Sequence, residues 1–143
     1  MSRCCGSEKM NESLVVLDTN IVSYFFNRHS NSLIYEDSVK GFNLGISFVT
    51  VGEMLQGAYR ARWSEKRIRA LDMFLHHFLL VRYSHPICEH WAKVRFQRRH
   101  RPISENDAWI AATALAYNAP LVTHNARDFM EIDGLAIITK HTP

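Results

Sequence analysis

Short apolar runs alternate with helical patterns along this chain, and the alternation restricts the possible folds more than any other feature of the sequence. Residues 13–17 (SLVVL) are rich in β-branched side chains, as expected of a strand buried on both faces. Residues 43–49 (NLGISFV) form a second expected strand, and a helical pattern follows each of the two. Strands separated by helices predict an α/β domain with a mostly parallel sheet.

The same alternation continues to the end of the chain. Thr19 and Asn20 are residue types that favour a helix N-terminus, and a helical pattern begins there. The other expected helices cover residues 50–62, most of 64–80, a segment from Pro86 onward and 107–117, and the other expected strands cover 80–84, 120–123 and 135–139. We therefore expect a sheet of four to five strands in one domain, residues 14–143, after a flexible leader, residues 1–13.

Composition limits the class of protein. Of 143 residues, 47% are hydrophobic and 22% are charged, which is typical of a globular protein rather than a disordered one. No window approaches the roughly 18 to 20 consecutive apolar residues of a membrane span, so we expect no membrane association. Cys4, Cys5 and Cys88 form neither a disulfide framework nor a Cys-x-x-Cys metal site, which favours the reducing cytoplasm.

Basic side chains are concentrated in two segments, although the net charge is only +3. Residues 95–101 (RFQRRHR) contain four arginines and a histidine, and residues 59–69 form a second basic stretch with aromatic residues. We expect Arg98, Arg99 and Arg101 to bind the backbone of a nucleic acid. The alternative is that both segments are simply solvated helix faces.

Acidic residues follow the expected strands. Asp18 comes directly after the first strand, Glu53 lies near the start of the helix after the second, and Asp107 begins the alanine-rich helix. Asn125 and Asp128 follow the strand at residues 120–123. Because the carboxyl ends of parallel strands meet at one edge of a sheet, we expect these side chains to lie close together.

A structural explanation of the acids remains open at this point. Residues 50–53 (Thr-x-x-Glu) and 104–107 (Ser-x-x-Asp) both have capping-box spacing, and Asp128 fits a turn. Asp18 is harder to explain in this way, since a carboxylate beside a buried strand is costly unless it is hydrogen-bonded or paired.

A cluster of carboxylates also has a chemical consequence. The acids repel one another and partly protonate unless a cation neutralises them. An all-oxygen ligand set favours Mg²⁺ or Mn²⁺ over zinc, and such an ion activates water for phosphodiester hydrolysis.

Four sequence motifs resemble those of PIN domains, especially the VapC-type toxins of toxin–antitoxin pairs. They are VVLDTNIVSYFF, ISFVTVGEMLQG, NDAWIAATALAYNAPLVTHNARDF and LAIIT, in the family's order and spacing over about residues 14–139. The resemblance implies a three-layer α/β/α sandwich and an endoribonuclease site that depends on Mg²⁺ or Mn²⁺.

The resemblance also assigns catalytic residues. The family's first three acids fall on Asp18, Glu53 and Asp107, and its fourth falls on Asn125 or Asp128. We favour Asp128 as the fourth carboxylate, so that the four acids hold the metal and Asn125 supports them.

Thr19 and Asn20 match the family's small polar pair after the first acid, where they orient it and contact the substrate. The alternative for both residues is a simple helix cap.

The family further implies partners. Its toxins form homodimers, cut RNA such as transfer or ribosomal RNA to inhibit translation, and are silenced by a VapB-type antitoxin that covers the active site. Candidates for lining that groove or the dimer face are Tyr24, Phe25, Phe26 and Trp63, with core packing as the alternative. A non-catalytic RNA- or protein-binding module with the same fold is the alternative function.

Overall fold

The computed structural model describes residues 13–140, and it contains one fully parallel sheet. The strands are ordered β3-β2-β1-β4-β5. They are β1 (Leu14–Leu17), β2 (Asn43–Ser47), β3 (Leu79–Val81), β4 (Leu121–Val122) and β5 (Ile137–Ile138). The predicted parallel sheet is confirmed. The predicted leader lies outside the described residues except for Ser13, and so do Cys4 and Cys5.

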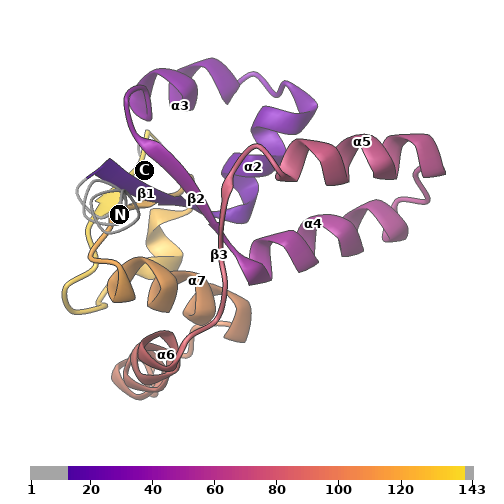
Figure 1. Cartoon of the computed structure of the whole chain (residues 1–143). Coiled ribbons are helices and arrows are strands. Elements are labelled where there is room, and N and C mark those ends of the chain that lie inside the picture. Colours follow the sequence, from indigo (N-terminus) through magenta and orange to yellow (C-terminus); the bar gives the residue numbers. More distant parts are fainter. Residues whose placement is uncertain (1–12, 141–143) are drawn as a thin grey trace, which may run out of the picture.

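Helices cover both faces of this sheet (Figure 1). They are α2 (Thr19–Asn27), α3 (Ser32–Ser38), α4 (Phe48–Arg60), α5 (Glu65–Leu75), α6 (His85–Gln97) and α7 (Glu105–Ala116), with a 3₁₀ turn η1 (Ala126–Phe129). Leu14 and Val16 of β1 pack in the core cluster that contains α7, whereas Val15 and Leu17 pack in the cluster that contains α2 and α4. This arrangement confirms the predicted α/β/α sandwich.

The alanine-rich sequence of α7 brings that helix close to the sheet. Ala108, Ala111 and Ala114 are fully buried against β1 and β4. Their small side chains let the helix axis approach the strands, so the first turn of α7 is held at the sheet edge. In the part of the chain that the structure describes, no helix is both long enough and apolar enough to cross a membrane.

Two of the predicted boundaries were wrong for a local reason. Helix α2 is capped by Asp18 rather than by Thr19 or Asn20, because the Asp18 carboxylate accepts a hydrogen bond from the Thr19 backbone N–H. Strand β2 ends at Ser47, whose hydroxyl caps α4, so the two residues after it are helical. Helix α3 was not predicted.

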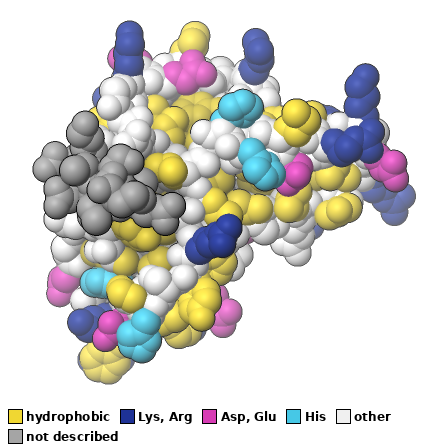
Figure 2. All heavy atoms as spheres, in the orientation of Figure 1, with side chains coloured by type: hydrophobic (Ala, Val, Ile, Leu, Met, Phe, Trp, Pro, Cys, Tyr) yellow, Lys and Arg dark blue, Asp and Glu magenta, His cyan; other side chains and the backbone are white. Residues whose placement is uncertain are grey.

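Helices α4 and α5 form a hairpin that extends away from the sheet (Figure 1). Lys and Arg side chains gather at its far end (Figure 2), where Arg60, Arg62 and Lys66 are exposed. The predicted basic stretch at residues 59–69 therefore lies at the tip of this arm.

Candidate active site

The predicted acids share one pocket of about 530 Å³ at the carboxyl ends of β1 and β4. We call it the acidic pocket. One end of it is lined by Asp18, Glu53, Asp107, Asn125 and Asp128. The structure thus brings together all five residues that the sequence proposed for catalysis, from four separate segments of the chain.

Asp18 is the most deeply placed of these acids, with 5% of its surface exposed. Its Oδ1 accepts a hydrogen bond from the Thr19 backbone N–H at 2.8 Å, and its Oδ2 accepts one from the Thr123 hydroxyl at 2.7 Å. Burial raises the pKa of Asp18 to about 6; the charges of Asp107 and Glu53 add to the rise, and the two hydrogen bonds oppose it. Asp18 is therefore rigidly held and costly to ionise.

Glu53 is not a helix cap, so that alternative was wrong. Its Oε1 accepts a hydrogen bond from the Thr19 hydroxyl at 2.6 Å, and its Oε2 accepts one from Asn106 Nδ2 at 3.1 Å. The Thr50 hydroxyl lies 3.0 Å from that of Thr19. Because Thr19 gives its single hydroxyl hydrogen to Glu53, Thr50 must donate to Thr19. These bonds tie Glu53 to α2 and α7.

Asp107 combines a helix-terminal position with a place in the pocket. Ser104 caps α7 by accepting a hydrogen bond from the Asp107 backbone N–H at 3.1 Å. The Asp107 carboxyl is half-buried in the acidic pocket. Burial is the largest cause that raises its pKa; a hydrogen bond from the Ser104 side chain to the carboxylate lowers it, and the charges of Asp128 and Glu53 raise it further. Ser104 is thus the cap of α7, and the Asp107 side chain faces the pocket.

Asn125 and Asp128 lie at the exposed mouth of the pocket. The Asn125 backbone N–H donates to the Thr123 hydroxyl oxygen at 3.0 Å, and the Asp128 N–H donates to the Asn125 carbonyl at 3.0 Å. Asp128 is therefore a turn residue of η1 as well as a lining residue. Both side chains are placed by a loop, unlike Asp18.

The polar pair after the first acid differs from the prediction in part. The Thr19 hydroxyl orients Glu53 rather than Asp18, and only the backbone N–H of Thr19 contacts Asp18. Asn20 lines the pocket, and among the described residues its buried Oδ1 has no hydrogen-bond partner. A buried oxygen without a partner calls for a water, an ion or a ligand.

The other end of the acidic pocket reaches the α4–α5 arm through Gly57 and Trp63. The Trp63 ring is stacked on Phe26 with centroids 5.8 Å apart, and the Arg67 guanidinium lies 3.7 Å above it. Trp63 therefore lines the pocket and also packs against the core, and aromatic and cationic neighbours already cover its ring.

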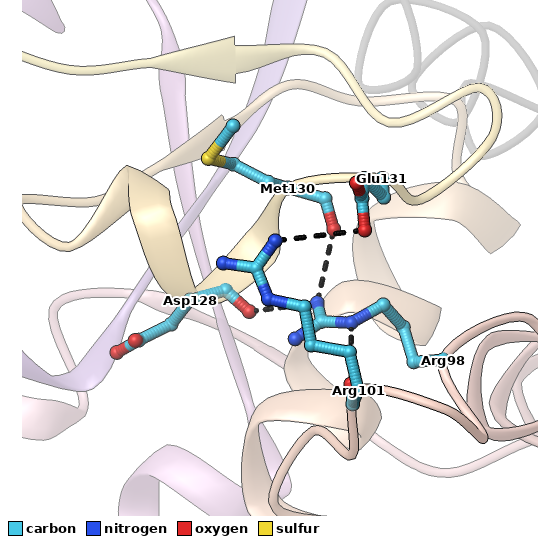
Figure 3. Close-up of polar contacts among 5 residues, drawn as sticks. All are labelled: Arg98, Arg101, Asp128, Met130 and Glu131. Atoms are coloured by element: carbon cyan, nitrogen blue, oxygen red, sulfur yellow. Dashed lines mark hydrogen bonds and ion pairs between the residues drawn. The ribbon is translucent and has the colours of Figure 1, made fainter.

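The three arginines proposed to bind substrate are placed very differently. Arg98 is only 5% exposed, and its guanidinium donates to the carbonyls of Arg101, Asp128 and Met130 (Figure 3). Three of its N–H donors are thus used within the protein, and binding of an RNA backbone by Arg98 stays a prediction. Arg99 lies 4.0 Å above the Phe96 ring.

Arg101 lines a second pocket of about 370 Å³, together with Arg127 and the largely buried Arg98. We call it the arginine pocket. Asp107 and Asp128 line both pockets, so the two are neighbours. Arg101 also forms an exposed ion pair with Glu131 at 3.5 Å. The predicted basic surface beside the acids is thus represented by Arg101 and Arg127.

Sequence reasoning missed Thr123, Asn106 and Arg127. Thr123 had a usable signal, because it directly follows β4 as Asp18 directly follows β1, and parallel strands place such residues side by side. The other two had no comparable signal, since their positions depend on how α7 and η1 pack.

The donor set can be compared with the needs of a metal ion. Within residues 13–140, no three His, Cys, Asp or Glu side chains are arranged so that together they could hold a metal ion as they stand. The pocket nevertheless offers only oxygen donors from its acids, together with the unpartnered Asn20 Oδ1. By chemistry, this set suits Mg²⁺ or Mn²⁺.

Comparisons with known proteins agree with this geometry. Residues 15–135 match the family model of the PIN domain. The chain is 32% identical over 126 residues to Ribonuclease VapC1 of Haemophilus influenzae strain R2866, covering 85% of this chain and 94% of that protein. Two solved structures are also similar. VapBC-1 from nontypeable H. influenzae has a TM-score of 0.76 at 32% identity and covers 88% of this chain and 97% of its own. VapBC2 from Rickettsia felis, bound to a promoter DNA fragment, has a TM-score of 0.76 at 28% identity and covers 88% and 98%.

Proposed function

This chain belongs to the PIN domain family, and we propose that it is the metal-dependent endoribonuclease toxin of a VapBC-type toxin–antitoxin pair. One observation carries the proposal: four acidic side chains from four segments line a single pocket at the carboxyl ends of the sheet. The similarity to a ribonuclease over most of the chain supports the reaction class.

Each residue has a task in this proposal. Asp18 and Asp107 are the principal metal ligands, and Glu53 and Asp128 complete the set. Bound there, Mg²⁺ or Mn²⁺ would supply positive charge for the phosphodiester and lower the pKa of the attacking water. Asn125 supports the fourth acid.

Hydrogen bonds within the protein prepare these acids. Thr123 fixes Asp18, while Thr19 and Asn106 fix Glu53, so two of the four carboxylates keep their orientation without a ligand. Preorganised groups need no reorganisation when the substrate arrives.

The arginine pocket would bind the RNA backbone. Arg101 and Arg127 line it beside Asp107 and Asp128, so a phosphate held there lies next to the reacting one. Guanidinium groups suit this task because they match phosphate geometry with two parallel donors.

The proposed partners are an antitoxin and a second copy of the chain. Two similar structures are VapBC complexes, which supports a VapB-type antitoxin that covers the acidic pocket. Leu80 and Tyr83 are exposed at or just after β3, an edge strand of the sheet, which supports a homodimer contact there. Such a toxin would act in the cytoplasm.

An RNA-cleavage time course tests the proposal. Purified protein would be incubated with transfer RNA and with total RNA in Mg²⁺, Mn²⁺ or EDTA, and Asp18→Asn protein would control for contaminating nuclease. We expect discrete cuts by the wild type in either metal and none in EDTA. RNA binding without cleavage in any metal would instead favour a non-catalytic binding module.

A further inference from the structure

Arg98 is a buried cation whose bonding differs from that of the other arginines in the basic segment. It follows the last turn of α6, and 5% of it is exposed. Its Nε donates to the Arg101 carbonyl at 2.8 Å, and its Nη1 donates to the carbonyls of Asp128 and Met130, both at 3.0 Å (Figure 3). Both hydrogens of Nη1 are thus directed at one loop.

That loop carries the fourth acid of the pocket. The two Nη1 bonds hold the backbone at Asp128 itself and two residues later, and the Asp128 N–H is held by the Asn125 carbonyl. The peptide groups on both sides of Asp128 are therefore fixed. Because the Asp128 side chain is exposed, the position of its backbone sets the region that its carboxylate can reach.

The charge of Arg98 acts on the same group of acids. Arg98 lines the arginine pocket next to Asp107, and its positive charge lowers the pKa of Asp107 while the charge of Asp128 raises it. Hydrogen bonds from a charged donor are about twice as strong as neutral ones. A loop held only by packing would need no cation, and burying a cation is costly.

We propose that Arg98 is a positioning residue of the active site: its guanidinium clamps the Asp128–Met130 backbone and so holds the Asp128 carboxylate at the mouth of the acidic pocket. This inference rests on the proposed function, since it assumes that Asp128 contributes to metal binding. Lysine is not expected to replace Arg98, because one ammonium group does not reproduce the two-nitrogen fork that reaches three carbonyls.

The test is a double-mutant cycle on Mn²⁺ affinity, measured by titration calorimetry without RNA. The proteins are the wild type, Arg98→Lys, Asp128→Asn, the double variant and the control Arg95→Lys. Arg95 is on α6 itself, but its guanidinium lies over the Trp91 ring at 5.4 Å rather than on carbonyls. We expect Arg98→Lys and Asp128→Asn each to weaken Mn²⁺ binding about 5- to 50-fold. The double variant should bind Mn²⁺ no more weakly than Asp128→Asn does. The Mn²⁺ affinity of Arg95→Lys should stay within about 2-fold of that of the wild type.

Other results would overturn the inference. If the effects of Arg98→Lys and Asp128→Asn multiply, Arg98 does not act through Asp128. Unchanged Mn²⁺ affinity in either single variant would also exclude the proposed role. Arg98→Gln, which is neutral and can still donate to one carbonyl, replaces Arg98→Lys should that variant not fold. Failure of both to fold would make Arg98 a purely structural residue.

Cleavage of RNA by the wild type separates this inference from the proposed function. Coupled Mn²⁺ affinities without any RNA cleavage would leave the positioning role standing and remove the nuclease proposal. Metal-dependent RNA cleavage together with uncoupled Mn²⁺ affinities would support the nuclease proposal and remove the positioning role of Arg98. Amide hydrogen exchange of residues 125–131 should be faster in Arg98→Lys than in Arg95→Lys, which reports directly on the clamp.

Discussion

Asp18 and Asp128 face the same pocket, but different parts of the fold hold them. Asp18 is fixed by its own side-chain hydrogen bonds at the end of a buried strand. Asp128 is exposed on a 3₁₀ turn, and its backbone is held by Arg98. The core therefore positions Asp18, and burial there raises the pKa of its carboxyl. The loop held by Arg98 positions Asp128 and leaves its carboxyl exposed to water.

Substituting the two acids should separate their contributions most strongly. We expect Asp18→Asn to reduce RNA cleavage by about 10³-fold or more and Asp128→Asn by about 10- to 100-fold, because hydrogen bonds hold the carboxylate of Asp18 in place and the carboxylate of Asp128 is exposed. Single-turnover cleavage rates in Mg²⁺ measure both effects. Asp18→Asn should stay folded and at least as stable as the wild type, since it removes carboxylate repulsion. Unfolding of Asp18→Asn would make that residue structural.

Removing the Thr123 hydroxyl, which donates a hydrogen bond to Asp18, should destabilise the folded protein. Thr123→Val leaves the buried Asp18 carboxylate with one hydrogen bond fewer, which should lower the free energy of unfolding by about 2 kcal/mol at pH 7. Thr113→Val is the matched control, because Thr113 is equally buried but donates to the neutral Trp109 carbonyl. Urea denaturation at pH 7 and pH 5 should show a pH-dependent loss for Thr123→Val only. Equal losses at both pH values would show that the charge of Asp18 plays no part.

The raised pKa of Asp18 predicts how stability depends on pH. Its pKa is about 6 in the folded protein and 3.8 ordinarily, so the folded state favours the protonated carboxyl. This contribution is complete below pH 3.8 and is lost as pH rises through 6. Relative to Asp18→Asn, the wild type in EDTA should lose about 1 kcal/mol of unfolding free energy between pH 5 and pH 7. Parallel pH profiles for the two proteins would contradict a raised pKa.

The cap of α7 should give the smallest effect. Ser104→Ala removes the acceptor for the Asp107 N–H and should lower the unfolding free energy by about 1 kcal/mol. Ser64→Ala at the start of α5 is a control of the same kind, because Ser64 caps its helix through the Arg67 N–H, with no acid of the pocket nearby in sequence. Thermal unfolding should show similar losses for both, while only Ser104→Ala changes Mn²⁺ affinity.

Sequence patterns predicted the sheet and the acid cluster because both depend on short-range rules. A buried β-branched run defines β1, and a parallel sheet then brings the residues after its strands to one edge. The role of Glu53 was ambiguous in the sequence, because Thr50 and Glu53 have the spacing of a capping box. The real cap is Ser47, since β2 ends two residues earlier than its alternating pattern suggests.

What the sequence did not predict depends on contacts between distant segments. Arg98 looks like an RNA ligand within a run of arginines, and only the packing of α6 against the loop at Met130 shows that three of its donors already bind carbonyls of the protein. The Glu53–Asn106 bond likewise joins residues that no local pattern connects. Burial of the side chain, rather than spacing in the sequence, distinguishes Arg98 from the exposed Arg99 and Arg101.

The most direct test of the central claim, that the acids form one metal site, is the anomalous difference density of crystals grown with Mn²⁺. We predict a single strong peak in the acidic pocket, at a bonding distance of about 2.1 Å from carboxylate oxygens of both Asp18 and Asp107. A peak outside the pocket, or none at saturating Mn²⁺, would contradict the claim and leave these carboxylates as structural groups.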